Sequence, residues 1–202
     1  MVSFCPYGPF LSLPAFSVLV ATICTWVATF DCSFFRISNV SDRGESISIG
    51  LWTIEYFETY ETVIWGETRT STLGDGECVL WSKNSGAGVS DLDAPLWIAR
   101  IFSLVASLAS IPLLVAILAP SCMTFSSTFF RRLSIALISE GVCTLISLSA
   151  IRSKWCLDGE DCTIRFSGIL CLLAVLFWFI AGCTSVCLKE SAFLLSVFFN
   201  TL

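Results

Sequence analysis

The segment SISIGLWTIEY, Ser46–Tyr56, lies at the centre of Asp31–Pro95, the only long polar stretch in this 202-residue chain. Its residues Ile47, Ile49 and Leu51 alternate with polar ones, which is typical of a β-strand with one covered face. The segment therefore predicts a strand-rich domain within a chain that is otherwise strongly apolar.

Two further segments of the polar stretch, Thr59–Trp65 and Glu77–Trp81, are rich in β-branched and aromatic residues. Turn-forming residues separate them: Gly66, Gly74-Asp75-Gly76 and Asn84–Gly88. We expect a small antiparallel sheet of three to five strands, followed at Ser90–Asp93 by a helix cap. Such a sheet has little core of its own, so it needs a disulfide or support from the rest of the chain.

Outward from this stretch the chain is apolar: 55% of all residues are hydrophobic and only 13% are charged. Phe10–Phe30 carries no charge, and its 21 residues match the ~20 that a membrane span requires. A signal peptide is the alternative, but the segment lacks a basic start and a cleavage site. We expect an all-α membrane bundle of four helices with a small extracellular antiparallel β-sheet. The predicted segments are spans at 10–30, 96–119, 133–151 and 166–188, extracellular loops at 31–95 and 152–165, a cytoplasmic loop at 120–132 and a cytoplasmic tail at 189–202.

Orientation follows from the bases close to the membrane. Arg131, Arg132 and Lys189 lie on the side of the chain ends, although Arg100, Arg152, Lys154 and Arg165 lie on the other. Asn39 begins a glycosylation sequon in the first loop, which is usable only outside the cytoplasm. We expect a multi-pass protein of the plasma membrane or an endomembrane, with cytoplasmic termini and a glycan at Asn39.

The charge distribution excludes several classes of function. The chain has a net charge of −5, and Asp31–Pro95 alone holds eleven acidic and four basic residues, a net −7. Nucleic acid is excluded as a partner, because its binding depends on cationic side chains. The chain has no histidine, the commonest general base and metal ligand. We therefore expect no catalytic residue, metal or cofactor.

Four of the eleven cysteines fall on the predicted extracellular side, the even number that a disulfide framework requires: Cys32, Cys78, Cys156 and Cys162. The local pairing, Cys32 with Cys78 and Cys156 with Cys162, is preferred, and the two cross-linked pairings remain open. The chain contains no C-x-x-C motif, which argues against zinc and against a thiol oxidoreductase. Cys122 and Cys187, at the cytoplasmic face, are candidates for palmitoylation.

Two ionisable residues fall inside predicted spans. Glu140 lies ~12 Å from the cytoplasmic end of its span, where an acid marks either a proton or ion path or a polar lock. We favour the lock, a protonated carboxyl that donates to Ser103, Ser107, Ser110 or Thr144. Arg100 lies one turn inside its span and is expected to reach the headgroups or carbonyls at the base of the sheet. A pairing of Arg100 with Glu140 is the weaker alternative.

Gly50-Leu51-Trp52 in the first loop and Ala99-Arg100 at the start of the second span resemble the corresponding motifs of the claudin-like tetraspan superfamily. This superfamily includes claudins, peripheral-myelin-type proteins and auxiliary channel subunits. The chain is also similar to uncharacterised four-span microalgal proteins. It departs from the family pattern in its cysteines, because within the first loop only Cys78 follows Trp52. The resemblance implies four spans with a sheet in the first loop.

We expect a non-enzymatic protein whose extracellular sheet contacts other membrane proteins in cis or in trans, including further copies of this chain. The alternative is an auxiliary subunit of an ion channel, or a cation-selective paracellular-type pore. A membrane enzyme or transporter that uses Glu140 is a third and weaker hypothesis.

Overall fold

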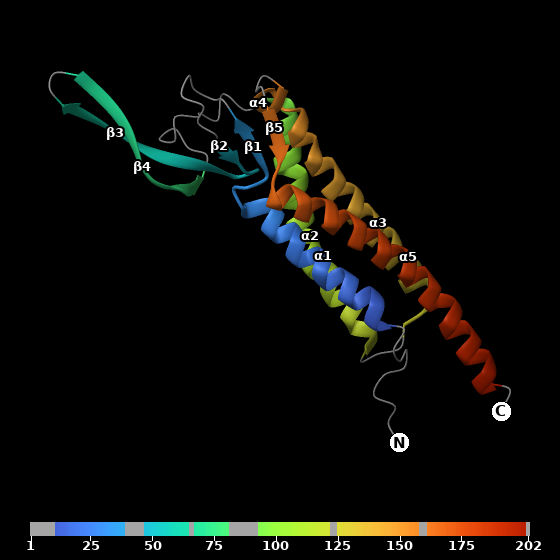
Figure 1. The fold of residues 1–202 in the computed structure, drawn as a ribbon. Coiled ribbons are helices and arrows are strands. Elements are labelled where there is room, and N and C mark those ends of the chain that lie inside the picture. The colour runs from blue at the N-terminus through green and yellow to red at the C-terminus, as the bar shows by residue number, and fades with distance from the viewer. Residues whose placement is uncertain are drawn as a thin grey trace.

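The computed structural model confirms the expected fold class, a four-helix bundle with a small antiparallel sheet at one end (Figure 1). Four helices are long and apolar enough to cross a membrane, which makes the chain a multi-pass integral membrane protein. These helices are α1 (Ser12–Phe30), α2 (Ala94–Leu118), α3 (Ser127–Ser147) and α5 (Phe166–Asn200). The structure describes residues 11–38, 47–64, 67–80, 93–121, 125–157 and 161–200.

The short connections between the helices are also helical. η4 (Ala119–Ser121) follows α2, and η5 (Leu148–Arg152) continues α3 towards the short helix α4 (Lys154–Leu157). At the start of α2 the Asp93 carboxylate accepts a hydrogen bond from Leu96 N at 3.4 Å, so Asp93 provides the expected cap. The rest of the predicted cap, residues 90–92, lies outside the described residues.

The sheet has five antiparallel strands in the order β4-β3-β2-β1-β5. The first loop supplies β1 (Phe35–Ser38), β2 (Ile47–Ile49), β3 (Thr53–Ile64) and β4 (Glu67–Leu80). The second loop supplies β5 (Asp161–Ile164), which pairs with β1 and which the sequence patterns did not indicate. The sheet therefore joins both loops at one end of the bundle.

The prediction that Gly74-Asp75-Gly76 forms a turn is wrong. β4 continues through these residues, and its register with β3 shifts from Tyr56↔Glu77 to Glu58↔Leu73. Three residues of β4 thus lie opposite Phe57 of β3, which is a β-bulge. Glycine tolerates a bulge as readily as a turn, so the glycine pair alone does not distinguish the two.

Helix α5 continues past the boundary expected at residue 188 and ends at Asn200. No proline or glycine occurs in Lys189–Asn200 to end it. At ~1.5 Å per residue the whole helix is ~52 Å long, more than a ~30 Å hydrocarbon core requires. Only Phe166–Cys187 qualifies as a span, and Figure 1 shows the last turns extending beyond the other helices.

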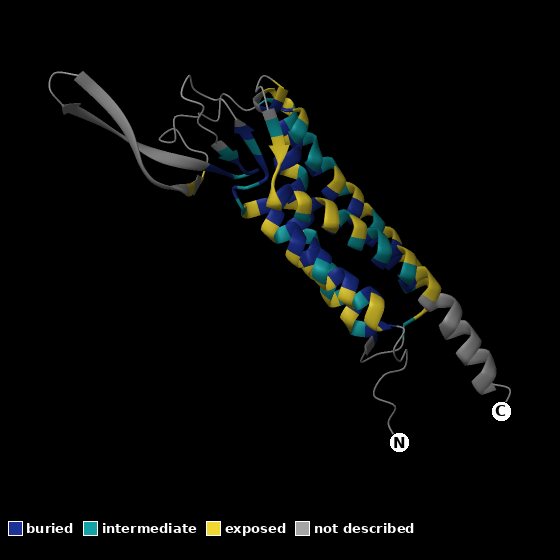
Figure 2. Ribbon diagram, in the orientation of Figure 1, coloured by how far each residue is buried: buried dark blue, intermediate teal, exposed yellow. Residues whose placement is uncertain are grey.

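Buried apolar side chains form two clusters, one inside the bundle and one where the sheet meets the bundle. The inner cluster includes Leu137 of α3 and Trp178 of α5. The cluster at the junction combines Phe35, Ile49 and Ile54 of the sheet with residues of α1, α2, η5, α4 and α5. Exposed residues lie along the outer surface of the bundle (Figure 2), and many are large and apolar, as a lipid-facing surface requires.

Candidate functional site

The Gly50-Leu51-Trp52 motif forms the tight connection between β2 and β3, at the point where the sheet meets the bundle. The Gly50 N–H donates to Thr53 O at 2.9 Å. A Cβ at position 50 would lie 2.2 Å from Asp31 O and 2.8 Å from Cys32 Cα. Any side chain at position 50 would therefore push the sheet away from the end of α1.

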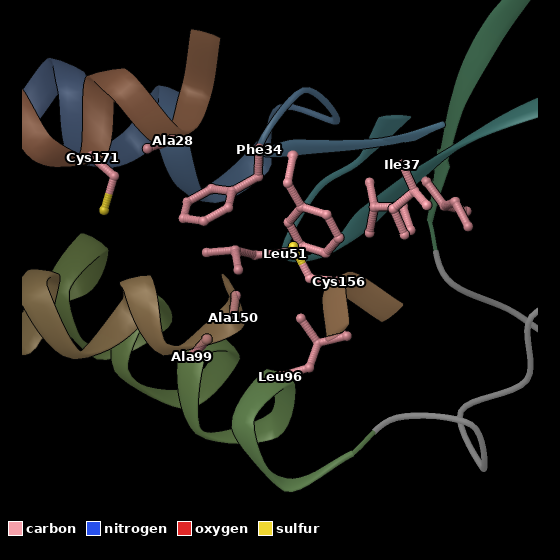
Figure 3. Close-up of a cluster of buried hydrophobic side chains, with 12 residues drawn as sticks. Ala28, Phe34, Ile37, Leu51, Leu96, Ala99, Ala150, Cys156 and Cys171 are labelled. Carbon is pink, nitrogen blue, oxygen red and sulfur yellow. The ribbon is translucent and has the colours of Figure 1, made fainter. Parts of the chain in front are cut away.

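Leu51 points from this connection into the bundle. It is 1% exposed, and Figure 3 shows it between Phe34 and Ala150. Below it lies a cavity of about 10 Å³, close to the size of one water molecule. Leu51 and residues of all four long helices line it: Thr25, Ala28, Thr29, Ser103, Ala106, Thr144, Ser147 and Cys171. Leu51 thus closes the interior of the bundle on the side of the sheet.

Arg100 lies beneath the sheet, 3% exposed. Its guanidinium carbon lies 5.4 Å from the centroid of the Trp52 ring and 5.9 Å from that of Trp97. Both distances suit a cation–π contact. The side chain is buried against two tryptophans rather than extended to the headgroups, and it connects the Gly-Leu-Trp motif to α2.

The structure contains both disulfides of the preferred local pairing. Cys32, after α1, is bonded to Cys78 of β4, with the two Cα atoms 5.9 Å apart. Cys156 of α4 is bonded to Cys162 of β5, with a Cα–Cα distance of 5.2 Å. The first bond fixes the edge strand β4 to the bundle, and the second fixes the opposite edge strand to α4.

Asp31 connects the end of α1 to the start of α5, a role that sequence reasoning missed. Its Oδ2 accepts hydrogen bonds from the hydroxyls of Ser33 and Ser167 and from Ser33 N at 3.3 Å. Burial alone would raise the pKa of Asp31, but the hydrogen bonds from Ser167 and Ser33 outweigh burial and lower it below 3.8. The sequence indicates this link only through an acidic residue just after one span and a serine at the start of another.

Asp93 links two segments by hydrogen bonds in the same way, on the other side of the bundle. The carboxylate of Asp93, which caps α2, also accepts a hydrogen bond from Lys154 N of α4. Close by, the Ser149 hydroxyl of η5 donates to Pro95 O of α2 at 3.2 Å. Hydrogen bonds thus fix both ends of the first loop, Asp31 and Asp93, to residues close to the two ends of the second loop, Ser167 and Lys154.

Glu140 lies deep in α3 and is only 4% exposed. The expected lock is absent from the described part of the chain, where Glu140 Oε1 has no hydrogen-bond partner. Three of the four expected partners donate their hydroxyl protons to carbonyl oxygens of their own helices: Ser103 to Arg100 O, Ser110 to Ser107 O and Thr144 to Glu140 O. The fourth, Ser107, donates to Thr29 Oγ1. The expected pairing of Glu140 with Arg100 is not formed either, since the guanidinium lies against Trp52 and Trp97.

Two other predicted sites, Asn39 and Cys122, lie outside the described residues. Within the described ranges, no three His, Cys, Asp or Glu side chains are grouped to hold a metal ion. No protein-family model matches the chain, and no match was found among curated proteins. The site must therefore be interpreted from its own geometry.

Proposed function

We propose that this is a non-enzymatic membrane protein whose sheet contacts other membrane proteins, in cis or in trans, including further copies of this chain. One observation carries the proposal. The base of the sheet is fixed to the bundle, whereas the paired strands β3 and β4 extend away from it (Figure 1). A partner can therefore reach this ribbon while the bundle stays in the membrane.

The proposal includes membership of the claudin-like superfamily. It is supported by the way Gly50, Trp52 and Arg100, which carry the resemblance, meet at one junction. Each has a physical role there, because Gly50 permits the close approach to Asp31 and Arg100 packs against Trp52. If these three residues matched the family motifs only by chance, they would not be expected to meet at one junction.

We also propose that the sheet is extracellular or lumenal and that the chain ends are cytoplasmic. Two disulfides at the sheet end support this orientation, since disulfides persist in oxidising compartments. A glycan on Asn39 would test it directly. Glycosidase treatment should increase the gel mobility of the wild-type protein and leave the Asn39→Gln variant unchanged, whereas cytoplasmic accessibility of the first loop would contradict it.

Site-specific photo-crosslinking in intact membranes tests the contact role. A crosslinking amino acid at Thr59, in β3, should give a discrete protein adduct. The same group at Leu108, a 60% exposed position on the outer face of α2, is the control and should label mainly lipid. Identical labelling at the two positions, with no protein adduct at Thr59, would count against the proposal.

The second candidate function is an auxiliary channel subunit or a cation-selective paracellular-type pore. The acidity of the ribbon favours it: Thr53–Leu80 holds six acidic residues and one arginine, a net −5. Such a surface attracts cations and basic partners. Native purification separates the two functions, because an auxiliary subunit would be recovered with a channel in fixed stoichiometry and an adhesion protein with copies of itself.

A further inference from the structure

The strands β3 and β4 form a two-stranded ribbon over most of their length. β2 pairs with β3 at Ile49↔Ile54, whereas β3 pairs with β4 as far as Ile64↔Glu67. Beyond Ile54 the ribbon therefore has an open edge on each side among the described strands, and it extends away from the bundle (Figure 1). A sheet of two strands is marginally stable in water unless a further strand or a packed surface supports it. An open edge is the place where a further strand adds.

The open edge of β4 is regular over residues 67–73. Its register with β3 is unbroken from Glu67 to Leu73, and the bulge at Gly74–Gly76 interrupts it beyond that point. A regular edge strand presents a row of unpaired backbone N–H and C=O groups that can accept another strand, whereas a bulge disrupts that row. Residues 67–73 are therefore the part of this edge that can pair.

The connection between the two strands determines which backbone groups of β4 point outwards. Ile64 pairs with Glu67 across a connection of two residues. The pair that flanks such a connection exchanges both of its hydrogen bonds, and hydrogen-bonded and non-hydrogen-bonded pairs then alternate along the ladder. Thr68, Thr70 and Thr72 therefore direct their N–H and C=O groups away from β3, towards the open edge.

The two strands of the ribbon differ in charge. β3 carries three glutamates and no basic residue, whereas residues 67–73 of β4 carry one acid, Glu67, and one base, Arg69. Two copies paired through β3 would place their glutamates on adjacent strands about 5 Å apart, where like charges are destabilising. Pairing through β4 would hold the two acidic strands about 14 Å apart, beyond the ~8 Å Debye length at physiological ionic strength. The charge of the ribbon thus favours β4 as the edge that meets a second copy.

The outward backbone groups also set the register of such a pair. Two identical antiparallel strands are related by a two-fold axis. With the axis at Thr70, Thr68 lies opposite Thr72 of the second copy, and all three outward-directed residues exchange hydrogen bonds, roughly six in total. An axis at Arg69 would leave roughly four of these bonds and would place the two arginines opposite each other. The edge of β4 is therefore complementary to a second copy of itself about Thr70.

We propose that two copies of this chain associate through β4, with residues 67–73 of each copy paired antiparallel about Thr70 in a four-stranded sheet of order β3-β4-β4-β3. This inference rests on the contact function proposed above and names a second copy as the partner. The pairing also gives the ribbon the further strands that a stable sheet requires. Its affinity comes from backbone hydrogen bonds, so it depends on the N–H of Thr70 rather than on the side chain.

The test uses the purified full-length protein in liposomes. Copies labelled with a donor or an acceptor fluorophore at the N-terminus are reconstituted together, and energy transfer is measured while the protein is diluted with lipid. Thr70→Pro removes the outward N–H and leaves the hydrogen bonds between β3 and β4 in place, so it should weaken self-association at least about tenfold. Thr70→Val keeps the N–H and a β-branched side chain, and it should associate within about twofold of the wild type. Both variants should retain the Cys32–Cys78 disulfide.

A second measurement keeps the test valid if Thr70→Pro does not fold. A photo-crosslinking amino acid at Thr70, activated in the source membrane, should join two copies of the chain, with both ends of the adduct within residues 67–73 by mass spectrometry. A monomeric wild type, or self-association of Thr70→Pro equal to that of the wild type, would overturn the proposal. An adduct with a different protein would also overturn it while supporting the contact function. The contact function is judged separately by replacement of residues 59–72, which removes the ribbon that Thr70→Pro leaves intact.

Discussion

The junction beneath the sheet and the layer of the bundle around Glu140 differ in how their carboxylates are held. At the junction, the Asp31 and Asp93 carboxylates bind groups on neighbouring segments, and the Arg100 guanidinium packs against two aromatic rings. In the layer, Glu140 Oε1 has no partner among the described residues. Carboxylates that accept hydrogen bonds from neighbouring segments specify how those segments are arranged, whereas Glu140 Oε1 makes no such bond with the described residues. The carboxylates of the junction therefore hold the sheet in place on the bundle.

Removal of the Cys32–Cys78 disulfide should have the largest effect on the junction. The bond spans 46 residues and the Cys156–Cys162 bond only 6, so loop entropy predicts losses of about 4 and about 2 kcal/mol. The free energy of unfolding of the two double serine variants, measured by denaturant titration in micelles, checks this. Equal losses would show that chain entropy does not explain how the sheet is fixed.

Substitution of Gly50 by alanine should have the second-largest effect on the free energy of unfolding. The added methyl group would meet Asp31 O at 2.2 Å, and separation of the connection from α1 should cost about 3 kcal/mol. Thr163→Ala, at an exposed position in β5, is the control and should change the free energy of unfolding by less than about 0.5 kcal/mol. A Gly50→Ala protein as stable as the wild type would show that the close approach to Asp31 does not require glycine.

The contact of Arg100 with Trp97 should be weaker and is best measured by a double-mutant cycle. Arg100→Met and Trp97→Leu, singly and together, should show a coupling free energy of unfolding of about 1 kcal/mol. The cycle of Arg100→Met with Trp26→Leu is the control, because Trp26 donates to Ser110, further along α2. A coupling near zero in the first cycle would mean that the rings do not hold the guanidinium.

The smallest effect should come from Asp31, and it should depend on pH. The pKa of Asp31 in the folded protein is below 3.8, so its stabilising contribution is fully present above that pH and is lost as the pH falls through the folded value. Because the group is partly exposed, Asp31→Asn should cost under about 1 kcal/mol at neutral pH. The difference in unfolding free energy between this variant and the wild type should shrink as the pH is lowered below 3.8. A difference that stays constant over this range would exclude the charged carboxylate as its origin.

Local patterns predicted much of this architecture. Strongly apolar runs of about 20 residues identified the spans, and the local cysteine pairing proved to be present. Pairings between distant segments were missed: β5 joins the sheet through β1, and Ser167 binds Asp31 across 136 positions. Short polar segments carry no signal of such partners. The expected lock at Glu140 is not formed with the described residues, because it depends on which side chains of neighbouring helices come within hydrogen-bond distance, and a list of residues cannot reveal that.

The register of β3 and β4 provides the most direct test of the contact function. Thr59 pairs with Thr72, so residues 59–72 can be replaced by Asn-Gly without removing the Tyr56↔Glu77 pair or Cys78. The shortened protein should keep its helicity and the Cys32–Cys78 disulfide. In native co-purification from the source membrane, the wild type should recover a stoichiometric membrane-protein partner or further copies of itself, and the shortened protein should recover neither. Equal recovery by the two proteins would contradict the claim that this ribbon is the contact surface.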